Sequence, residues 1–337
     1  MKILVTGGGG FLGKALCRAL IQAGHEVRSL SRNLYTELEA LGVEQRQADI
    51  SKALDEHYDF FKEVDAIFHT AARVGMWGQY PDFYCTNVLG TRNLLKACKQ
   101  NSISRFIFTS SPSVIADGTD LEGVDESYTY PTSHLAHYPK TKARAEREVL
   151  EANSKALRTI ALRPHLIFGP GDTNLIPTVI ERAREGKLVQ VGDGKNLCDF
   201  SYIDDCVAAH ICALSACDEN PAACGRAYFI SQGDPMSLWS WIAAVLRAND
   251  LTPPRRTVSY GKAYALAALM EIPYKLFPFL GEPRLSRFLV TQMAHHHYFD
   301  ISAAEKELGY LPSVSVEEGL RKTFSNETVE PARVSNL

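Results

Sequence analysis

A glycine-rich loop near the N-terminus constrains this chain more than any other feature. The apolar run Ile3–Val5 leads into glycines at Gly7, Gly10 and Gly13, and residues 11–23 carry apolar side chains at helical spacing. Glycines allow a tight turn and a close approach of the backbone to a pyrophosphate, which the N–H groups at a helix N-terminus then bind. Glycines also mark ordinary turns, but the flanking strand and helix favour a dinucleotide-binding loop.

The rest of the first half alternates short β-rich runs with helical patterns. This alternation predicts a doubly wound α/β fold, that is, a parallel Rossmann sheet with helices on both faces. The predicted strands are Val27–Leu30, Ala66–His69, Arg105–Thr109 and Thr159–Leu162, and the predicted helices are Phe83–Gln100 and Tyr138–Asn153.

The alternation loosens after the last of these strands and predicts a second, smaller lobe. We expect residues 1–168 to form the dinucleotide-binding domain, and residues 196–231 to return to it. We expect residues 169–325 to form a mainly helical substrate-binding lobe, and residues 326–337 to form a polar tail.

Charge and composition exclude several classes of function. The 337 residues include 36 Lys and Arg against 39 Asp and Glu, so there is no basic excess for binding nucleic acid. The eight cysteines include no C-x-x-C pair, which predicts buried or free thiols. With no evident secretory signal or apolar stretch of transmembrane length, we expect a cytoplasmic protein. The consecutive His295, His296 and His297 cannot all face one ion from regular structure, so we expect no metal site.

The second predicted strand is followed by an arginine, at the position where a carboxylate favours NAD in related sheets. A carboxylate there hydrogen-bonds the ribose 2′-hydroxyl, but this chain has Ser31 and Arg32. These side chains suit a 2′-phosphate, so the sequence favours NADPH or NADP over NAD. The alternative for Arg32 is an ordinary surface arginine. Asp49 lies further along, at a position where an acid could bind the adenine amino group. The alternative for Asp49 is an aspartate that stabilises a turn.

Tyr138 and Lys142 form the candidate catalytic pair, because residues four apart share one face of a helix. An isolated tyrosine has a pKa of about 10, and a neighbouring ammonium is expected to lower it toward neutrality. Tyr138 is then a proton donor to a carbonyl oxygen, and Lys142 also holds a nicotinamide ribose. Ser111, at the carboxyl end of a predicted strand, is the candidate for orienting the carbonyl, with Ser110 and Ser113 as competitors.

In order along the chain, these motifs resemble the extended short-chain dehydrogenase/reductase family. The resemblance covers most of the chain and includes Asn87, before a Val-Leu-Gly-Thr run, and a Tyr-Ile-Asp-Asp run from Tyr202. It implies that Asn87 maintains the active-site architecture, and that a homodimer forms through helices near Asn87–Lys99 and Tyr138–Leu150. Together with the residues above, the expected cofactor contacts are Gly7, Gly10, Phe11, Leu12, Gly13, Ser31, Arg32, Asp49, Ile50, Thr70, Ala71, Ala72, Asn87, Tyr138, Lys142, Pro164 and Leu166.

Finer motifs resemble the 3β-hydroxysteroid dehydrogenase-like branch of this family. They include residues 75–78, 111–114, 169–172, 228–231 and 281–283, and they are similar to bacterial reductases of long-chain olefin biosynthesis. This resemblance implies NADPH-dependent reduction of the β-keto group of a fatty-acyl-derived 2-alkyl-3-oxoalkanoic acid to the 2-alkyl-3-hydroxyalkanoic acid, or the reverse oxidation. Two other hypotheses stay open. One is an NAD-dependent steroid dehydrogenase or nucleotide-sugar epimerase/dehydratase, and the other is a non-catalytic NADP-binding protein.

The expected substrate contacts are Met76, Trp77 and Ser113. Met76 and Trp77 follow a predicted strand, so they approach the active site or pack as a loop under the second lobe. The apolar segment Tyr264–Leu280 has three possible roles: core, a wall for acyl chains, or a contact with a membrane surface or another pathway enzyme.

Overall fold

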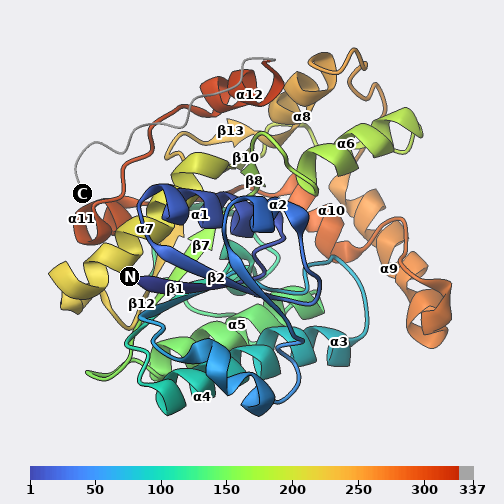
Figure 1. Ribbon diagram of the computed structural model, residues 1–337. Coiled ribbons are helices and arrows are strands. Elements are labelled where there is room, and N and C mark those ends of the chain that lie inside the picture. The colour runs from blue at the N-terminus through green and yellow to red at the C-terminus, as the bar shows by residue number, and fades with distance from the viewer. Residues whose placement is uncertain (326–337) are drawn as a thin grey trace.

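The computed structural model describes residues 1–325, which are built around a seven-stranded parallel sheet (Figure 1). The strand order is β12-β7-β5-β4-β1-β2-β3, so the direction in which strands are added reverses between β1 and β4. Ligands of such sheets bind outside the carboxyl ends of the strands at this reversal. The strands are β1 (Lys2–Thr6), β2 (Glu26–Ser31), β3 (Glu44–Gln47), β4 (Ala66–His69), β5 (Arg105–Thr109), β7 (Arg158–Pro164) and β12 (Arg226–Ile230).

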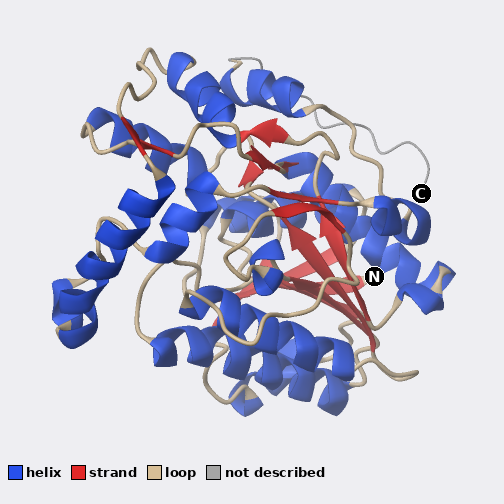
Figure 2. Cartoon of the chain, turned by 180° about the vertical axis from the view of Figure 1, so that it is seen from behind, coloured by secondary structure: helices blue, strands red, loops and turns tan. Residues whose placement is uncertain are grey.

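The central strands are buried on both faces because their residues alternate between two helical layers. Val5 of β1 packs in one core cluster with Leu16, and Leu4 packs in the other cluster with Leu94. Near-continuous apolar runs are typical of parallel strands covered on both sides. Figure 2 shows helices on both sides of the strands. One layer contains α1 (Phe11–Gln22) and α7 (Ile203–Glu219), and the other contains α4 (Gly90–Asn101) and α5 (His137–Glu151).

The predicted doubly wound sheet with a smaller helical C-terminal region is confirmed. β4 and β5 have the predicted bounds, and the other predicted elements begin and end within a few residues of theirs, apart from one helix. That helix contains a π-helical turn, Cys85–Leu89, between α3 (Tyr80–Tyr84) and α4. The sequence does not predict β3, because all four of its residues are polar.

After β7 the chain builds a smaller region and also returns to the main sheet. β12 pairs with β7 in parallel, with Tyr228 opposite Leu162.

Within residues 1–325, no helix combines the length and apolar character needed to cross a membrane. The predicted polar tail, residues 326–337, lies outside the described residues. The remaining helices are α2 (Thr36–Ala40), α6 (Leu175–Arg184), α8 (Leu238–Arg247), α9 (Tyr260–Leu276), α10 (Arg287–Ala294), α11 (Ser302–Leu308) and α12 (Val316–Phe324), and the remaining strands are β6 (Leu121–Val124), β8 (Ile167–Phe168), β9 (Gln190–Val191), β10 (Leu197–Cys198), β11 (Ser201–Tyr202), β13 (Met236–Ser237), β14 (Thr257–Val258) and β15 (His297–Phe299).

Candidate active site

The glycine loop turns directly from β1 into α1, and its shape requires two of the three spaced glycines. Gly7 has a φ of +74°, and a Cβ there would lie 2.9 Å from the Cα and N of Ala71. A Cβ on Gly13 would lie 2.8 Å from the Cα of Gly8. Gly10 is the N-cap of α1, and its N–H donates to the Gly7 carbonyl at 2.9 Å. The loop is therefore a backbone cradle at a helix N-terminus, which fits a pyrophosphate.

Four of the predicted cofactor residues lie beside this cradle or after β3. Phe11 and Leu12 open α1, where Phe11 is half-buried and Leu12 belongs to the core. Ile50 is also buried in the core. Asp49 is exposed, and its Oδ1 accepts a hydrogen bond from the Ser51 N–H at 2.9 Å, as in an ordinary aspartate turn.

The residues after β4 lie beside the glycine loop, where the strand order reverses. Thr70 Oγ1 donates to the Thr6 carbonyl at 2.8 Å, and Thr6 Oγ1 lies 2.8 Å from His69 Nδ1. These bonds join the ends of β1 and β4 through side chains. Ala71 and Ala72 follow and are half-buried, and Ala71 lies directly against Gly7 of the loop.

The residues after β2 form an exposed loop that β3 ties down. Ser31 ends β2, and the Arg32 carbonyl accepts a hydrogen bond from Gln47 Nε2 at 2.9 Å. Within residues 1–325, no hydrogen bond or ion pair engages the Arg32 guanidinium, so it is available to a ligand. The ring of Tyr35 covers the glycine loop, since a Cβ on Gly9 would lie 2.5 Å from its Cδ2 atom. The sequence prediction missed Tyr35 and Gln47, both of which shape this loop.

The three predicted catalytic residues meet at the carboxyl end of β5. Tyr138 and Lys142 lie on α5, and Ser111 follows β5. The Ser111 side chain lies close enough to Tyr138 to exert a lowering effect on its pKa. Ser111 Oγ also lies 3.0 Å from Ser113 Oγ, and Lys142 Nζ donates to the Thr109 carbonyl at 2.6 Å. This contact with Tyr138 favours Ser111 over its neighbours as the hydroxyl that would orient a carbonyl.

Burial controls the protonation of the catalytic pair. It raises the pKa of Tyr138 to about 12, and the nearby Ser111 side chain opposes the rise. It lowers the pKa of Lys142 to about 7, and the negative charge of Glu146 opposes that fall. The predicted lowering of the Tyr138 pKa is therefore wrong, because desolvation by burial is the largest cause and raises it. Tyr138 is a protonated phenol at neutral pH, which is the form that donates a proton.

A buried ion pair lies one helical turn beyond Lys142. Arg163 Nη2 lies 2.6 Å from Glu146 Oε1, and the two side chains are 3% and 0% exposed. The Tyr130 hydroxyl donates to the same Glu146 oxygen at 2.5 Å. Buried charges are tolerated when they are paired and hydrogen-bonded in this way. The pair joins α5 to β7 and provides a counter-charge close to Lys142.

Asn87 holds the catalytic helix from within the π-helical turn. Its Oδ1 accepts from the Arg73 N–H at 2.8 Å, and its Nδ2 donates to Thr141 Oγ1 at 3.1 Å. Thr141 lies between Tyr138 and Lys142 on α5. The buried amide thus connects the loop after β4 to the helix that carries the catalytic pair, a use of π-helical turns that is frequent at functional sites.

The turn after β7 carries backbone strain. Pro164 ends β7 and is buried, and Leu166 has a φ of +40°. Such a conformation costs a non-glycine residue on the order of 1–3 kcal/mol and persists where the surrounding structure maintains it. Here the His165 N–H donates to Ser201 Oγ at 3.1 Å.

A cavity of about 490 Å³ begins beside the catalytic helix, a volume typical of small-molecule sites. Met76 and Trp77 line one side of it, together with His137, which directly precedes Tyr138. The facing wall comes from α9 and α10 and includes Lys275. The structure thus places two of the three predicted substrate residues in one cavity, whereas Ser113 is bonded to Ser111.

Helix α9, which provides most of the predicted apolar segment, contributes only Ala263 and Ala267 to the buried core. Its buried residues are Ala263, Ala267 and Glu271, whereas Leu269 is 66% and Leu276 68% exposed. Figures 1 and 2 both show α9 projecting from the rest of the molecule. One side of α9 lines the cavity, and its leucines face outward.

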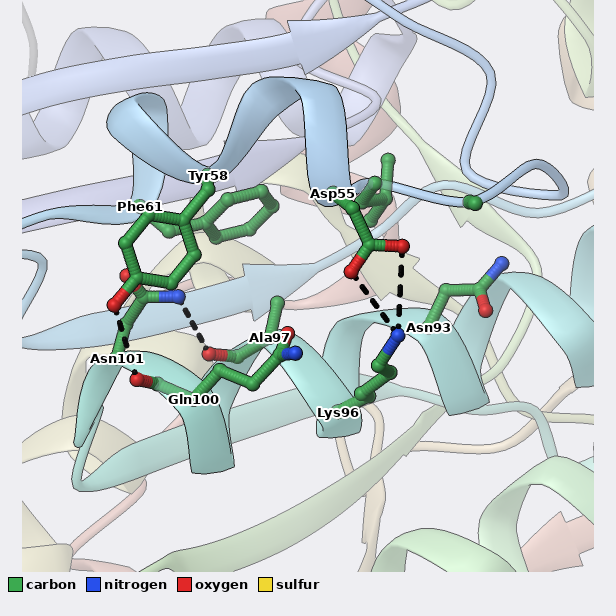
Figure 3. A pocket seen from close by; sticks show the side chains of 10 residues that line it. Asp55, Tyr58, Phe61, Asn93, Lys96, Ala97, Gln100 and Asn101 are labelled. Atoms are coloured by element: carbon green, nitrogen blue, oxygen red, sulfur yellow. Dashed lines mark hydrogen bonds and ion pairs between the residues drawn. The ribbon is translucent and has the colours of Figure 1, made fainter.

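A smaller hollow lies between the 3₁₀ turn Asp55–Phe61 and α4, on the same side of the sheet as α5 (Figure 3). Its volume is about 40 Å³. Asp55 and Lys96 form an ion pair of 3.1 Å there, and the Tyr58 hydroxyl donates to the Gln100 carbonyl at 3.3 Å. A space of this size holds water and not a dinucleotide or a fatty acid.

The three consecutive histidines have separate partners. His295 Nδ1 lies 2.9 Å from Asp120, and His297 Nδ1 lies 2.6 Å from His165 Nε2. Within residues 1–325, no three His, Cys, Asp or Glu side chains converge as metal ligands do.

The cavity wall also contains residues that the sequence prediction missed. Glu271 is 3% exposed, and its Oε2 accepts from Lys275 Nζ at 2.9 Å and from Arg287 Nε at 3.0 Å. The available signal was a charged pair four residues apart inside an apolar segment. Arg287 lies too far along the chain to be assigned to that pair from spacing alone.

Comparison with known proteins identifies the family. A model of the 3-beta hydroxysteroid dehydrogenase/isomerase family matches residues 4–259. A 2-alkyl-3-oxoalkanoate reductase of Stenotrophomonas maltophilia (strain K279a) is 43% identical over 324 residues, which cover 96% of this chain and 98% of that relative. A decarboxylating sterol-4-alpha-carboxylate 3-dehydrogenase of Mus musculus is 31% identical, covering 96% of this chain and 90% of the relative.

A solved structure shares the architecture. MoeE5 in complex with UDP-glucose and NAD is 25% identical and superposes with a TM-score of 0.73, covering 96% of this chain and 97% of that one. Its fold agrees with the parallel sheet and helical C-terminal region described above. The chain therefore belongs to the 3-beta hydroxysteroid dehydrogenase/isomerase family and is an oxidoreductase.

Proposed function

We propose that the protein reduces the β-keto group of a 2-alkyl-3-oxoalkanoic acid to the 2-alkyl-3-hydroxyalkanoic acid, or catalyses the reverse oxidation. The observation that carries this proposal is that Ser111, Tyr138 and Lys142 meet at the carboxyl end of β5, while His137, which directly precedes Tyr138, lines the 490 Å³ cavity. The substrate class is supported by the relative named 2-alkyl-3-oxoalkanoate reductase, which aligns over almost its whole length.

In this mechanism the protein supplies the proton and the orientation. A nicotinamide dinucleotide, when bound, supplies or accepts the hydride. Ser111 and Tyr138 hydrogen-bond the ketone oxygen, and the Tyr138 phenol donates its proton as that oxygen becomes an alcohol. The buried Lys142 ammonium stabilises the phenolate that remains until it is reprotonated. Asn87 keeps α5 in register with the loop after β4.

The cofactor in this proposal is NADPH or NADP in preference to NAD. The glycine cradle fits the pyrophosphate, and Tyr35 and Ser31 lie beside it. The argument for the 2′-phosphate is the unengaged guanidinium of Arg32 in a position without a carboxylate.

The proposal is tested by following absorbance at the nicotinamide band. Purified protein is mixed with NADPH and either a freshly prepared 2-alkyl-3-oxoalkanoic acid or UDP-glucose. We expect NADPH to be consumed with the oxo acid only, and Tyr138→Phe to abolish that consumption. No consumption with the oxo acid, at any chain length soluble in the assay, would contradict the proposal.

A nucleotide-sugar epimerase or dehydratase is the second candidate, because MoeE5 has the same fold and was solved with UDP-glucose and NAD. Conversion of UDP-glucose, followed by chromatography of the sugar nucleotide, would favour it.

We also propose a cytoplasmic homodimer that acts in long-chain olefin biosynthesis. The exposed leucines of α9 suit contact with another pathway enzyme or a membrane surface. Light scattering after size-exclusion chromatography measures the oligomeric state, and co-sedimentation with lipid vesicles tests the membrane contact. A monomeric protein would contradict the proposed homodimer. A protein that does not sediment with vesicles would contradict the membrane contact.

A further inference from the structure

Two cations and one carboxylate form a charged cluster on the cavity wall that faces the catalytic helix. Glu271 lies between Lys275 and Arg287, with Lys275 Nζ and Arg287 Nη2 each 2.9 Å from Glu271 Oε2. One negative charge against two positive charges leaves the cluster a net charge of +1. Glu271 is the sole carboxylate among the residues that line the cavity.

Both cations keep donors that Glu271 does not use. The Lys275 ammonium has three N–H groups and donates one of them to Glu271, and its side chain is 54% exposed. Arg287 uses Nε and Nη2 on Glu271, and its side chain is 32% exposed. Glu271, which is almost fully buried, thus fixes both cations at the cavity surface.

The cluster lines the same cavity as His137 of the catalytic helix. Burial lowers the pKa of His137, with smaller contributions from the charges of Lys140 and Lys275, and His137 directly precedes Tyr138. The Lys275 ammonium also lies 5.9 Å from the centre of the Trp77 ring, on the other side of the cavity. The cavity therefore has a cation on the wall that faces Trp77 and His137.

We propose that Lys275 and Arg287, held by Glu271, bind the carboxylate of the substrate, while Trp77 and Met76 contact its alkyl chains. The proposal rests on the proposed function, since an oxo acid presents its carboxylate one carbon away from the ketone. The site selects acids over neutral esters or ketones of the same shape. Lys275 and Arg287 are thus specificity residues, and Glu271 is a positioning residue.

Binding of a non-reactive acid tests the site without turnover. 2-Hexyldecanoic acid and its methyl ester are titrated below their aggregation concentrations while tryptophan fluorescence is followed. Trp77 is half-buried in the cavity, whereas Trp239 and Trp241 are buried, so a Trp77→Phe variant assigns the signal. We expect the acid to bind roughly tenfold more tightly than the ester.

The decisive variant is Lys275→Gln, with Lys262→Gln on an exposed position of the same helix as its matched control. We expect Lys275→Gln to weaken binding of the acid roughly tenfold and to leave binding of the ester within about twofold of the wild type. We expect Lys275→Arg to restore the affinity for the acid. Equal loss for acid and ester, or an equal effect of Lys262→Gln, would overturn the proposal.

The two proposals fail in different ways. If the wild type reduces the oxo acid but Lys275→Gln does not weaken acid binding, the carboxylate site is wrong and the proposed function stands. If acid binding depends on Lys275 while the wild type turns over no oxo acid, the proposed function is wrong and the anion site stands.

Discussion

The two sides of the active site are built from different material. At the sheet edge, backbone and buried side chains determine the geometry: Gly7 lies against Ala71, and Lys142 is 2% exposed. At the cavity wall, a projecting helix provides Lys275, whose side chain is 54% exposed. Substitutions at the sheet edge should therefore affect every substrate and the fold itself, whereas substitutions on the wall should distinguish one substrate from another.

The largest effect is expected for Tyr138→Phe. Loss of the proposed proton donor should lower kcat by about 10²–10⁴-fold for every substrate, and leave the Kd for NADPH within about twofold. Steady-state kinetics and NADPH fluorescence titration measure both quantities. Tyr58→Phe, in the small hollow of Figure 3, is the matched control and should retain activity. Substantial residual activity of Tyr138→Phe would place the proton donor elsewhere.

Gly13→Ala compared with Gly261→Ala contrasts the two regions directly. A Cβ on Gly13 meets the backbone of Gly8 at 2.8 Å, so we expect destabilisation of about 1–3 kcal/mol and weaker cofactor binding. A Cβ on Gly261 at the start of α9 meets nothing within 4 Å, so that variant should be neutral or more stable by up to about 1 kcal/mol. Thermal unfolding measures the stability of both variants. Equal shifts in Tm would contradict the expected difference between the glycine loop and α9.

Arg32→Gln should change the cofactor preference and spare the chemistry. Removing the cation from the loop after β2 is expected to weaken NADPH roughly tenfold, because a charge-assisted hydrogen bond to phosphate is lost. The affinity for NADH and the kcat at saturating cofactor should stay within about twofold. Competitive titration of the two cofactors measures this effect, and an equal loss for both would assign Arg32 a structural role.

Lys142→Met should remove the destabilisation caused by burying an ammonium, so its free energy of unfolding should differ from that of the wild type in a pH-dependent way. Burial lowers the pKa of Lys142 to about 7, against about 10.4 in an unfolded chain. At a pH between these two pKa values the unfolded chain binds more protons than the folded one. The destabilisation by the buried ammonium is therefore complete below about pH 7 and decreases as the pH rises toward 10. The inactive Lys142→Met variant should be more stable than the wild type at pH 6, by on the order of 1 kcal/mol.

Urea unfolding at pH 6, 8 and 10 measures that difference, with the exposed Lys140→Met as its control. We expect the stability difference of Lys142→Met to shrink toward zero at pH 10. A difference that stays constant or grows with pH would show that the ammonium is not desolvated in the native state.

The sequence predicts the sheet edge far better than the cavity wall. Motifs such as Gly7–Gly13 and Tyr138 with Lys142 are local, and their spacing alone places them on a turn and on one helix face. The π-helical turn around Asn87 escaped prediction, because it depends on bonds to Arg73 and Thr141 from other segments. The direction of the Tyr138 pKa was wrong because spacing carries no measure of burial.

The wall depends on tertiary contacts that no local pattern specifies. Glu271 meets Arg287 only after the chain has left α9 and returned as α10. The apolar character of residues 264–280 is equally compatible with core, channel or contact surface. Only the folded chain shows that most of this segment is exposed, with one charged side turned toward the cavity.

The projection of α9 has a consequence for how such a protein can diversify. With Ala263, Ala267 and Glu271 as its buried positions, most of the helix can accept substitutions at little cost to the free energy of unfolding. Mutations there can retune the accepted chain length or head group while the proton donor and the glycine cradle stay intact. Directed evolution of substrate range should therefore begin on α9 and leave the strand ends untouched.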